Sequence, residues 1–164
     1  MSGGIEWTRI ATPQGPMILA ARDGGLVGAW FEGQKHFDGI QPDWHEAPAS
    51  AVLKQAAEQL GEWFAGQRTR FELPLAPEGS VFQREVWAAI ARLGFGETAA
   101  YGTLAAQLGR PKAARAVGAA TGRNPLTIIV PCHRLLGRDG ALTGYAGGLE
   151  RKRALLAFEA GARS

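Results

Sequence analysis

The sequence predicts an α+β fold in two parts, a small mixed domain followed by a mostly helical one. Residues 1–79 contain short apolar runs separated by turn signals and one helical stripe, whereas residues 80–164 contain several segments of helical periodicity. The formal charge also changes sign, from −4 in the first segment to +7 in the second. We therefore expect two domains, residues 1–78 and residues 79–164.

The first domain opens with strands. Three strand-like runs are separated by the turn signals PQG and DGG: residues 5–12, 16–23 and 26–33. Residues 34–48 are polar and lack a clear period, so we expect a loop there. Apolar residues that recur every fourth position predict a helix over residues 49–64: Val52, Ala56, Leu60 and Phe64. Residues 71–79 look like a last short strand and a linker.

The second domain reads as a series of helices. Ser80 and Gln83 have the spacing of a capping box, and an apolar stripe follows them: Phe82, Val86, Ala89, Ile90 and Leu93. A short helix over residues 101–108, a turn through Gly109 and Pro111, and a second helix over residues 112–120 together predict a helix-turn-helix. A helical hairpin packed in the core is the alternative.

The basic residues suggest a polyanionic partner. Between residues 110 and 138 there are six basic side chains and no acidic one: Arg110, Lys112, Arg115, Arg123, Arg134 and Arg138. A solvated basic face is the ordinary explanation of such a run. In the second helix, however, small residues such as Ala114 and Gly118 would allow close approach to a nucleic-acid groove, with Arg115 projecting into it. We expect Arg123 to contact DNA as well.

The only cysteine lies in the segment TIIVPCHRLLG. Residues 128–130 are β-branched and predict a strand that Pro131 ends, which places Cys132 at the strand terminus. A lone cysteine is commonly a small buried hydrophobe. Here His133 and Arg134 follow at once and could stabilise a thiolate, which favours a nucleophile. Neighbouring strand residues point to opposite faces, so His133 reaches Cys132 only through a turn or a bridging water.

A carboxylate near the C-terminus is the candidate partner for this histidine. If residues 149–160 form a helix, Glu159 lies in the apolar stripe beside Leu155 and Leu156. A buried carboxylate is unfavourable without a partner, so we expect Glu159 to bind a buried donor, with His133 as the candidate. The alternative is a frayed last turn with Glu159 in water.

The loop GRDGALTGYAGG joins these two segments. Gly144, Gly147 and Gly148 indicate a backbone that bends sharply or comes close to a ligand. A glycine-rich hairpin turn is the equally ordinary explanation. The loop lacks the GxxxxGK[ST] pattern of a phosphate-binding loop.

Several other chemistries are not expected. One cysteine with scattered histidines has no zinc-ligand spacing, and no haem or dinucleotide motif is present, so we expect neither metal nor cofactor. No window approaches eighteen apolar residues, and the N-terminus does not read as a secretory signal. Because a reactive thiol survives best in a reducing compartment, we expect a soluble cytoplasmic protein without membrane contact.

Residues 80–160 resemble one family closely, the O6-alkylguanine-DNA alkyltransferases, also called methylated-DNA–protein-cysteine methyltransferases. The resemblance rests on FQREVW, FGET followed by YG, KAARAVG, GRNP, IIVPCHR and GYAGG, and on a glutamate 27 positions after the cysteine. It implies a small N-terminal ribonuclease-H-like α/β domain and a C-terminal winged helix-turn-helix domain. Some relatives bind zinc through N-terminal cysteines, which are absent here.

The resemblance also implies roles for the residues around the cysteine. Members of this family flip a damaged guanine out of duplex DNA and transfer its O6 alkyl group to a cysteine, here Cys132. His133 would accept the thiol proton through a water, and Glu159 would hold His133. Asn124 would occupy the hinge between the recognition helix and the active-site strand.

The remaining implied roles concern the DNA and the flipped base. Tyr101 would help rotate the nucleotide and donate a hydrogen bond as guanine departs, and Arg115 would fill the vacated space in the stack. The loop of Tyr145, Ala146 and Gly147 would line the guanine pocket. Because Ala146 stands where some relatives have serine, only a backbone N–H there could reach the guanine O6.

The expected function is therefore a single-turnover repair reaction on double-stranded DNA by a monomer. O6-methylguanine is the main expected substrate and O4-methylthymine a further one. Two other classes remain possible from sequence: a non-catalytic binder of alkylated DNA, whose known examples lack the cysteine, and a cysteine hydrolase that would turn over on esters or amides.

Overall fold

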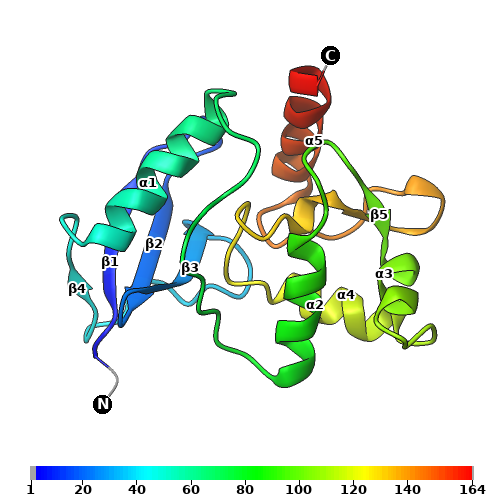
Figure 1. Cartoon of the computed structure of the whole chain (residues 1–164), viewed down its shortest axis with the longest axis horizontal. Coiled ribbons are helices and arrows are strands. Elements are labelled where there is room, and N and C mark those ends of the chain that lie inside the picture. The colour runs from blue at the N-terminus through cyan, green and yellow to red at the C-terminus, as the bar shows by residue number, and fades with distance from the viewer. Residues whose placement is uncertain (1–2, 164) are drawn as a thin grey trace. The chain divides into compact units, whose positions relative to one another are not determined.

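The computed structural model describes residues 3–163, apart from the side chains of 162 and 163. The chain divides into two compact units, residues 1–78 and residues 79–164. The first is built on a sheet and the second is mostly helical (Figure 1). This architecture confirms the α+β fold that the sequence predicts.

The first unit contains a four-stranded sheet in the order β3-β2-β1-β4. The three long strands pair antiparallel through short turns: β1 (Glu6–Ile10), β2 (Met17–Arg22) and β3 (Gly25–Phe31). The helix α1 (Ala51–Phe64) packs against β2 and β3, and Figure 1 shows it lying along the sheet. Its predicted stripe is buried except for Phe64, which is half-buried.

Two predictions for this unit are wrong. The loop of residues 34–48 contains a two-residue strand, β4 (His45–Glu46), which pairs parallel with β1. Residues 71–79 form no strand. They contribute one isolated bridge between Leu26 and Leu75, because prolines lie on both sides of Leu75 and cannot donate to a longer ladder.

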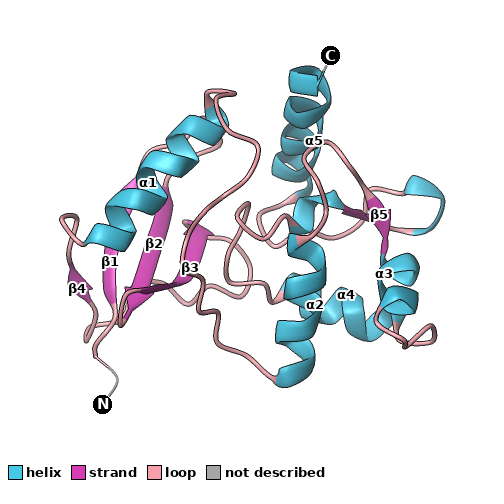
Figure 2. Cartoon of the chain, in the orientation of Figure 1, coloured by secondary structure: helices cyan, strands magenta, loops and turns pink. Residues whose placement is uncertain are grey.

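The described part of the second unit consists mainly of helices, which Figure 2 shows in cyan. The helices are α2 (Val81–Ala91), α3 (Tyr101–Gln107), α4 (Ala114–Gly122) and α5 (Leu149–Arg163). Two 3-10 turns, η1 (Cys132–Arg134) and η2 (Arg138–Gly140), lie on either side of β6 (Leu135–Leu136), which pairs parallel with β5 (Ala99–Ala100). This small ladder connects the start of α3 with the segment that follows the cysteine.

The helix-turn-helix forms as predicted, with shifts of one or two residues in its boundaries. Helix α3 ends before Gly109, whose φ of 74° suits a residue without a side chain. Helix α4 begins two residues later than predicted, because the Ala113 amide donates to the Arg110 carbonyl at 2.9 Å and closes a turn there. The indole N–H of Trp87 on α2 donates to the Ala120 carbonyl at 2.8 Å and fastens α4 to α2.

The capping box at the start of α2 is also confirmed. The Gln83 amide donates to the Ser80 hydroxyl at 3.1 Å, and the Ser80 amide donates to the Gln83 side chain at 2.9 Å. Both groups lack a partner within the helix, so this reciprocal pair defines where α2 begins.

Candidate active site

The segment that leads into the cysteine is a tight turn, so the strand predicted over residues 128–130 is wrong. The Val130 amide donates to the Leu126 carbonyl at 2.8 Å, and Ile128 has a φ of 73°. This φ is uncommon for a β-branched residue and requires support from the surrounding structure. β-Branched composition indicated a strand, but a local turn with tertiary support replaces it.

Asn124 provides that support. Its buried side-chain amide donates to the Val130 carbonyl at 2.9 Å, and its Oδ1 accepts the Leu126 amide at 3.0 Å. The side chain therefore spans the turn from the end of α4 to the residues before Cys132. This geometry agrees with the hinge position that the resemblance implied.

The cysteine itself lies at the start of η1, so the chain turns directly after Pro131. Cys132 is a free, buried thiol. Burial raises its pKa, although a hydrogen bond with Asn124 and the charge of Lys152 partly oppose the increase. The cysteine is consequently a thiol at neutral pH, and a base must remove its proton before or during attack.

His133 and Glu159 form the buried pair that the sequence predicted. His133 Nε2 lies 2.8 Å from Glu159 Oε2, and both side chains are almost fully buried. The solvated position for Glu159 was the alternative, and it is excluded. Burial lowers the pKa of His133 despite the raising effect of Glu159, which favours the neutral imidazole.

Arg134 makes the carboxylate of Glu159 stable in the interior. Its guanidinium donates to both oxygens, with Nε 2.9 Å from Oε1 and Nη2 2.7 Å from Oε2. Burial alone would raise the pKa of Glu159, but hydrogen bonds and charge from His133 and Arg134 outweigh it and lower the pKa to about 2. The sequence had suggested that Arg134 stabilises a thiolate, whereas here it binds Glu159.

Lys152 is a residue of the site that the sequence analysis missed. Its side chain is fully buried, and its ammonium donates to the Thr143 and Gly144 carbonyls at 2.6 and 3.1 Å. Burial lowers its pKa to about 8, opposed by the charge that Cys132 carries when ionised. Lys152 lies seven residues before Glu159, on the same helical stripe, so the argument that identified Glu159 applied to it equally.

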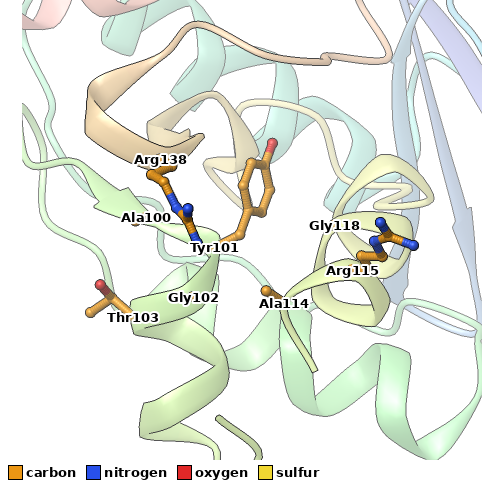
Figure 3. A pocket seen from close by; sticks show the side chains of 8 residues that line it. All are labelled: Ala100, Tyr101, Gly102, Thr103, Ala114, Arg115, Gly118 and Arg138. Atoms are coloured by element: carbon orange, nitrogen blue, oxygen red, sulfur yellow. The ribbon is translucent and has the colours of Figure 1, made fainter. Parts of the chain in front are cut away.

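Tyr101 begins α3 beside a cavity of about 500 Å³ (Figure 3). The lining residues come from the start of α3, from α4 and from η2: Ala100, Tyr101, Gly102, Thr103, Ala114, Arg115, Gly118 and Arg138. Burial raises the pKa of the Tyr101 hydroxyl, opposed by a hydrogen bond with Thr143, and an ionised Cys132 would raise it further. Tyr101 thus lines the cavity and also interacts electrostatically with the cysteine.

Three of the four residues that the sequence predicts to contact DNA line the cavity. Ala114, Arg115 and Gly118 line it from α4, and the Arg115 side chain is exposed. Arg123 is also exposed but lies at the C-terminal cap of α4 and is not part of the cavity wall. The small residues leave the face of α4 open beside its one long basic side chain.

The glycine-rich loop bends next to this site. Gly144 and Gly148 have positive φ values of 27° and 95°, and the Gly148 amide closes a turn by donating to the Tyr145 carbonyl at 2.9 Å. Gly147 is buried and Ala146 half-buried. Among the described residues the buried Tyr145 hydroxyl has no hydrogen-bond partner, so it is available to a ligand.

Neither a metal centre nor a membrane span is found in the described chain. Within residues 3–163, no group of three or more His, Cys, Asp or Glu side chains is arranged to hold a metal ion. None of the helices in that range combines the length and apolar character that crossing a bilayer requires.

Comparison with known proteins agrees with this arrangement. The family model for the 6-O-methylguanine DNA methyltransferase ribonuclease-like domain matches residues 5–77, and the model for its DNA binding domain matches residues 81–161. The solved structure of Mycobacterium tuberculosis OGT in complex with DNA superposes with a TM-score of 0.89 at 42% identity, covering 96% of this chain and 94% of that one.

Two curated relatives extend the similarity over nearly the whole sequence. The methylated-DNA–protein-cysteine methyltransferase of Mycolicibacterium paratuberculosis is 46% identical over 155 residues, which are 94% of this chain and 92% of the relative. The protein of the same name from Methanosarcina barkeri is 46% identical over 151 residues, 92% of this chain and 94% of the relative. With both domain models matched in order and identities of this size, the chain belongs to the 6-O-methylguanine DNA methyltransferase family.

Proposed function

We propose that this protein repairs alkylated DNA by moving the O6 alkyl group of a guanine irreversibly onto Cys132. One observation carries the proposal: the free thiol of Cys132 directly precedes a histidine that is held by a buried, ionised carboxylate. Relatives with this domain pair are named methylated-DNA–protein-cysteine methyltransferases. The preferred substrate is O6-methylguanine in duplex DNA, with O4-methylthymine as a second substrate.

The chemistry follows from the protonation states. The Glu159 carboxylate accepts a hydrogen bond from Nε2–H of His133, so Nδ1 of the neutral ring carries no proton and can take the Cys132 proton through a bridging water. The sulfur then forms a bond to the methyl carbon while the bond from that carbon to O6 breaks. Guanine leaves with a hydrogen bond from Tyr101 and takes up one proton at the ring. This proton balances the one that Cys132 gave to His133, so the thiol proton passes overall to the base.

The base reaches the thiol by leaving the helix. Tyr101 rotates the nucleotide, Arg115 from α4 fills the space left in the stack, and the Tyr145 to Gly147 loop receives the guanine. Flipping requires a few kcal/mol, which these contacts must offset. Residues 79–164 carry both DNA binding and catalysis in this scheme, and residues 1–78 act as a separate domain.

The product is a thioether, which nothing in the site is equipped to reverse. Each molecule therefore reacts once. We further propose that it acts as a monomer and without a cofactor. A single buried thiol of this kind is best preserved in a reducing compartment, which supports a cytoplasmic location.

The test is intact-protein mass spectrometry after mixing with a duplex that contains one O6-methylguanine. We expect one added methyl group per protein, located on Cys132 by peptide mapping. Cys132→Ala should transfer nothing and still bind the duplex. Turnover beyond one equivalent, or a methyl group on another residue, would contradict the mechanism. Hydrolysis of esters without DNA would indicate a cysteine hydrolase.

A further inference from the structure

Arg138 is a charged residue of the cavity that none of the proposed steps uses. It lines the cavity wall together with Tyr101 and Arg115. Its side chain is exposed and makes no ion pair with any described residue, not even with its neighbour Asp139. In contrast, Arg110 lies 3.7 Å from Glu85, and Arg134 binds Glu159. Arg138 is therefore free to bind a ligand.

The backbone holds Arg138 in a defined place. Register in the β5–β6 ladder pairs Ala100 with Leu136, so Tyr101 and Arg138 follow the two strands at the same end. The turn η2 is closed by the Ala141 amide, which donates to the Arg138 carbonyl at 3.2 Å, and by the Gly137 amide, which donates to the Ala141 carbonyl at 2.8 Å. These main-chain hydrogen bonds and the ladder before the turn fix the backbone position from which the Arg138 side chain extends.

The two arginines lie on either side of Tyr101. Figure 3 shows the Tyr101 ring between the Arg138 and Arg115 guanidinium groups, which come from η2 and α4. Among the described residues, none of the side chains that line the cavity is acidic, so this wall carries only positive formal charge. This arrangement suits an anion that lies beside Tyr101, and a guanidinium binds the two oxygens of a phosphate with paired hydrogen bonds.

We propose that Arg138 binds a backbone phosphate of the DNA strand that carries the damaged base, on the side of Tyr101 away from Arg115. The inference rests on the proposed function, since that function places a rotating nucleotide at Tyr101. Flipping rotates a nucleotide about its own backbone, so its flanking phosphates stay close to the residue that turns it. Arg138 holds one of them there, whereas Arg115 fills the stack.

The first experiment measures duplex binding and single-turnover transfer over a range of salt concentrations. Arg138→Ala should lower the second-order rate constant on duplex about ten-fold, the value of one charge-assisted hydrogen bond. The slope of log affinity against log salt should become shallower by about 0.9. Arg138→Lys should restore the salt slope, because an ammonium also neutralises a phosphate.

Arg153→Ala is the matched control, because this substitution removes the same charge at a different place. Arg153 is exposed on α5 and does not line the cavity. This variant should keep the parental slope. All variants should react with the free base O6-benzylguanine at the parental rate, because that substrate has no phosphate. An Arg138→Ala protein with an unchanged salt slope, or one that loses reaction with the free base, would overturn the proposal.

The second experiment identifies the phosphate. Duplexes carry one neutral methylphosphonate at successive positions around the lesion. Replacement at one position of the damaged strand should slow the parent and leave Arg138→Ala unaffected. If methylphosphonate replacement at every position slows Arg138→Ala by the same factor as the parent, the contact is refuted. If the parent binds with an Arg138-dependent salt slope but transfers no methyl group, the proposed function fails and the phosphate contact stands.

Discussion

The two units of the molecule bury different kinds of polar side chain. In the described part of residues 1–78, the buried polar side chains are Thr8, Gln34 and Gln59, and none is charged. In the described part of residues 79–164 the buried set includes four titratable side chains besides the cysteine: His133, Arg134, Lys152 and Glu159. The first unit therefore does not incur the free-energy cost of desolvating buried charges, whereas the second does.

Neutral amides are sufficient where the task is to hold loops. Gln59 on α1 accepts the Glu72 amide at 2.8 Å and donates to the Glu72 carbonyl at 3.0 Å, which attaches the segment after α1. Gln34 accepts the Phe31 amide at 2.8 Å at the end of β3. These contacts satisfy backbone groups without burying an ion.

The second unit buries ions and compensates each one. Glu159 is held by His133 and Arg134, and Lys152 by two carbonyls of the pocket loop. Replacing such a network with apolar residues is often neutral or favourable for stability, so stability alone does not account for it. Burial of titratable groups, more than polarity in general, therefore distinguishes the reactive unit from the other one.

Removing the charge of Glu159 should have the largest effect. Glu159→Gln removes the carboxylate that orients His133 and stabilises its protonated form. Transfer should therefore slow by about 10²–10⁴-fold in quenched reactions at saturating duplex, with binding near the parental value. The substitution also leaves Arg134 buried without a carboxylate, so we expect lower stability in urea titrations. A variant that reacts at the parental rate would mean that the pair serves packing alone.

The ionisation of Glu159 also makes the free energy of unfolding depend on pH. The folded pKa of Glu159 is about 2, below its ordinary value of 4.5. Its stabilising contribution is thus complete above pH 4.5 and is lost as the pH falls from there towards 2. The parent should lose more stability than Glu159→Gln across that window, as measured by urea unfolding at each pH. Parallel curves would contradict the assigned pKa.

Arg115 should show a large effect restricted to duplex DNA. If it fills the gap left by the flipped base, Arg115→Ala should slow duplex repair on the order of 10–100-fold beyond its loss in affinity, corresponding to a few kcal/mol of flipping free energy. Arg115→Lys should not restore the rate, because an ammonium does not stack. Equal slowing with the free base O6-benzylguanine would instead point to a damaged active site.

Lys152 tests whether a buried charge tunes the thiol. Lys152→Met removes the charge that lowers the pKa of Cys132, so the pH profile of thiol alkylation by iodoacetamide should show a slower reaction than in the parent below pH 8. Because the Lys152 pKa is about 8, the charge is lost above that pH and the two profiles should converge there. Lys54→Met, at an exposed position in the first unit, is the control and should leave the profile unchanged.

Gln59 provides the corresponding test in the first unit. Gln59→Ala leaves the amide and carbonyl of Glu72 without these side-chain partners, so the free energy of unfolding should fall by about 1–3 kcal/mol. The transfer rate of the folded protein should remain parental, since the residue holds a loop. A specific loss of transfer rate would remove the distinction between the two units.

The smallest effect is expected for an exposed ion pair. Arg9 and Glu32 pair on the sheet of the first unit with half of the Arg9 side chain in solvent. Arg9→Ala should change the free energy of unfolding by less than about 1 kcal/mol and leave repair unaffected. A larger loss in thermal melts would show that this unit also depends on charge.

Local patterns were sufficient for most of the helices and for the candidate nucleophile. The capping box at Ser80, the stripe of α1 and the glycine after α3 depend on residues close in sequence, and each was readable there. Glu159 could be paired with His133 because a carboxylate within an apolar stripe needs a donor, and few donors were available. Arg138 was counted only as part of the basic run, because nothing local indicated its place beside Tyr101.

The sequence by itself thus determined the two-part α+β organisation and the helix-turn-helix. It also identified Cys132 as the candidate nucleophile and Glu159 as the candidate partner of His133. Only the tertiary structure decided that residues 127–130 turn, that β4 joins the sheet, that Arg134 binds Glu159, and that Lys152 is buried. The physical reason is the range of the interactions. Periodicity, caps and turns act over a few residues, whereas burial and ion pairing depend on segments brought together from distant parts of the chain.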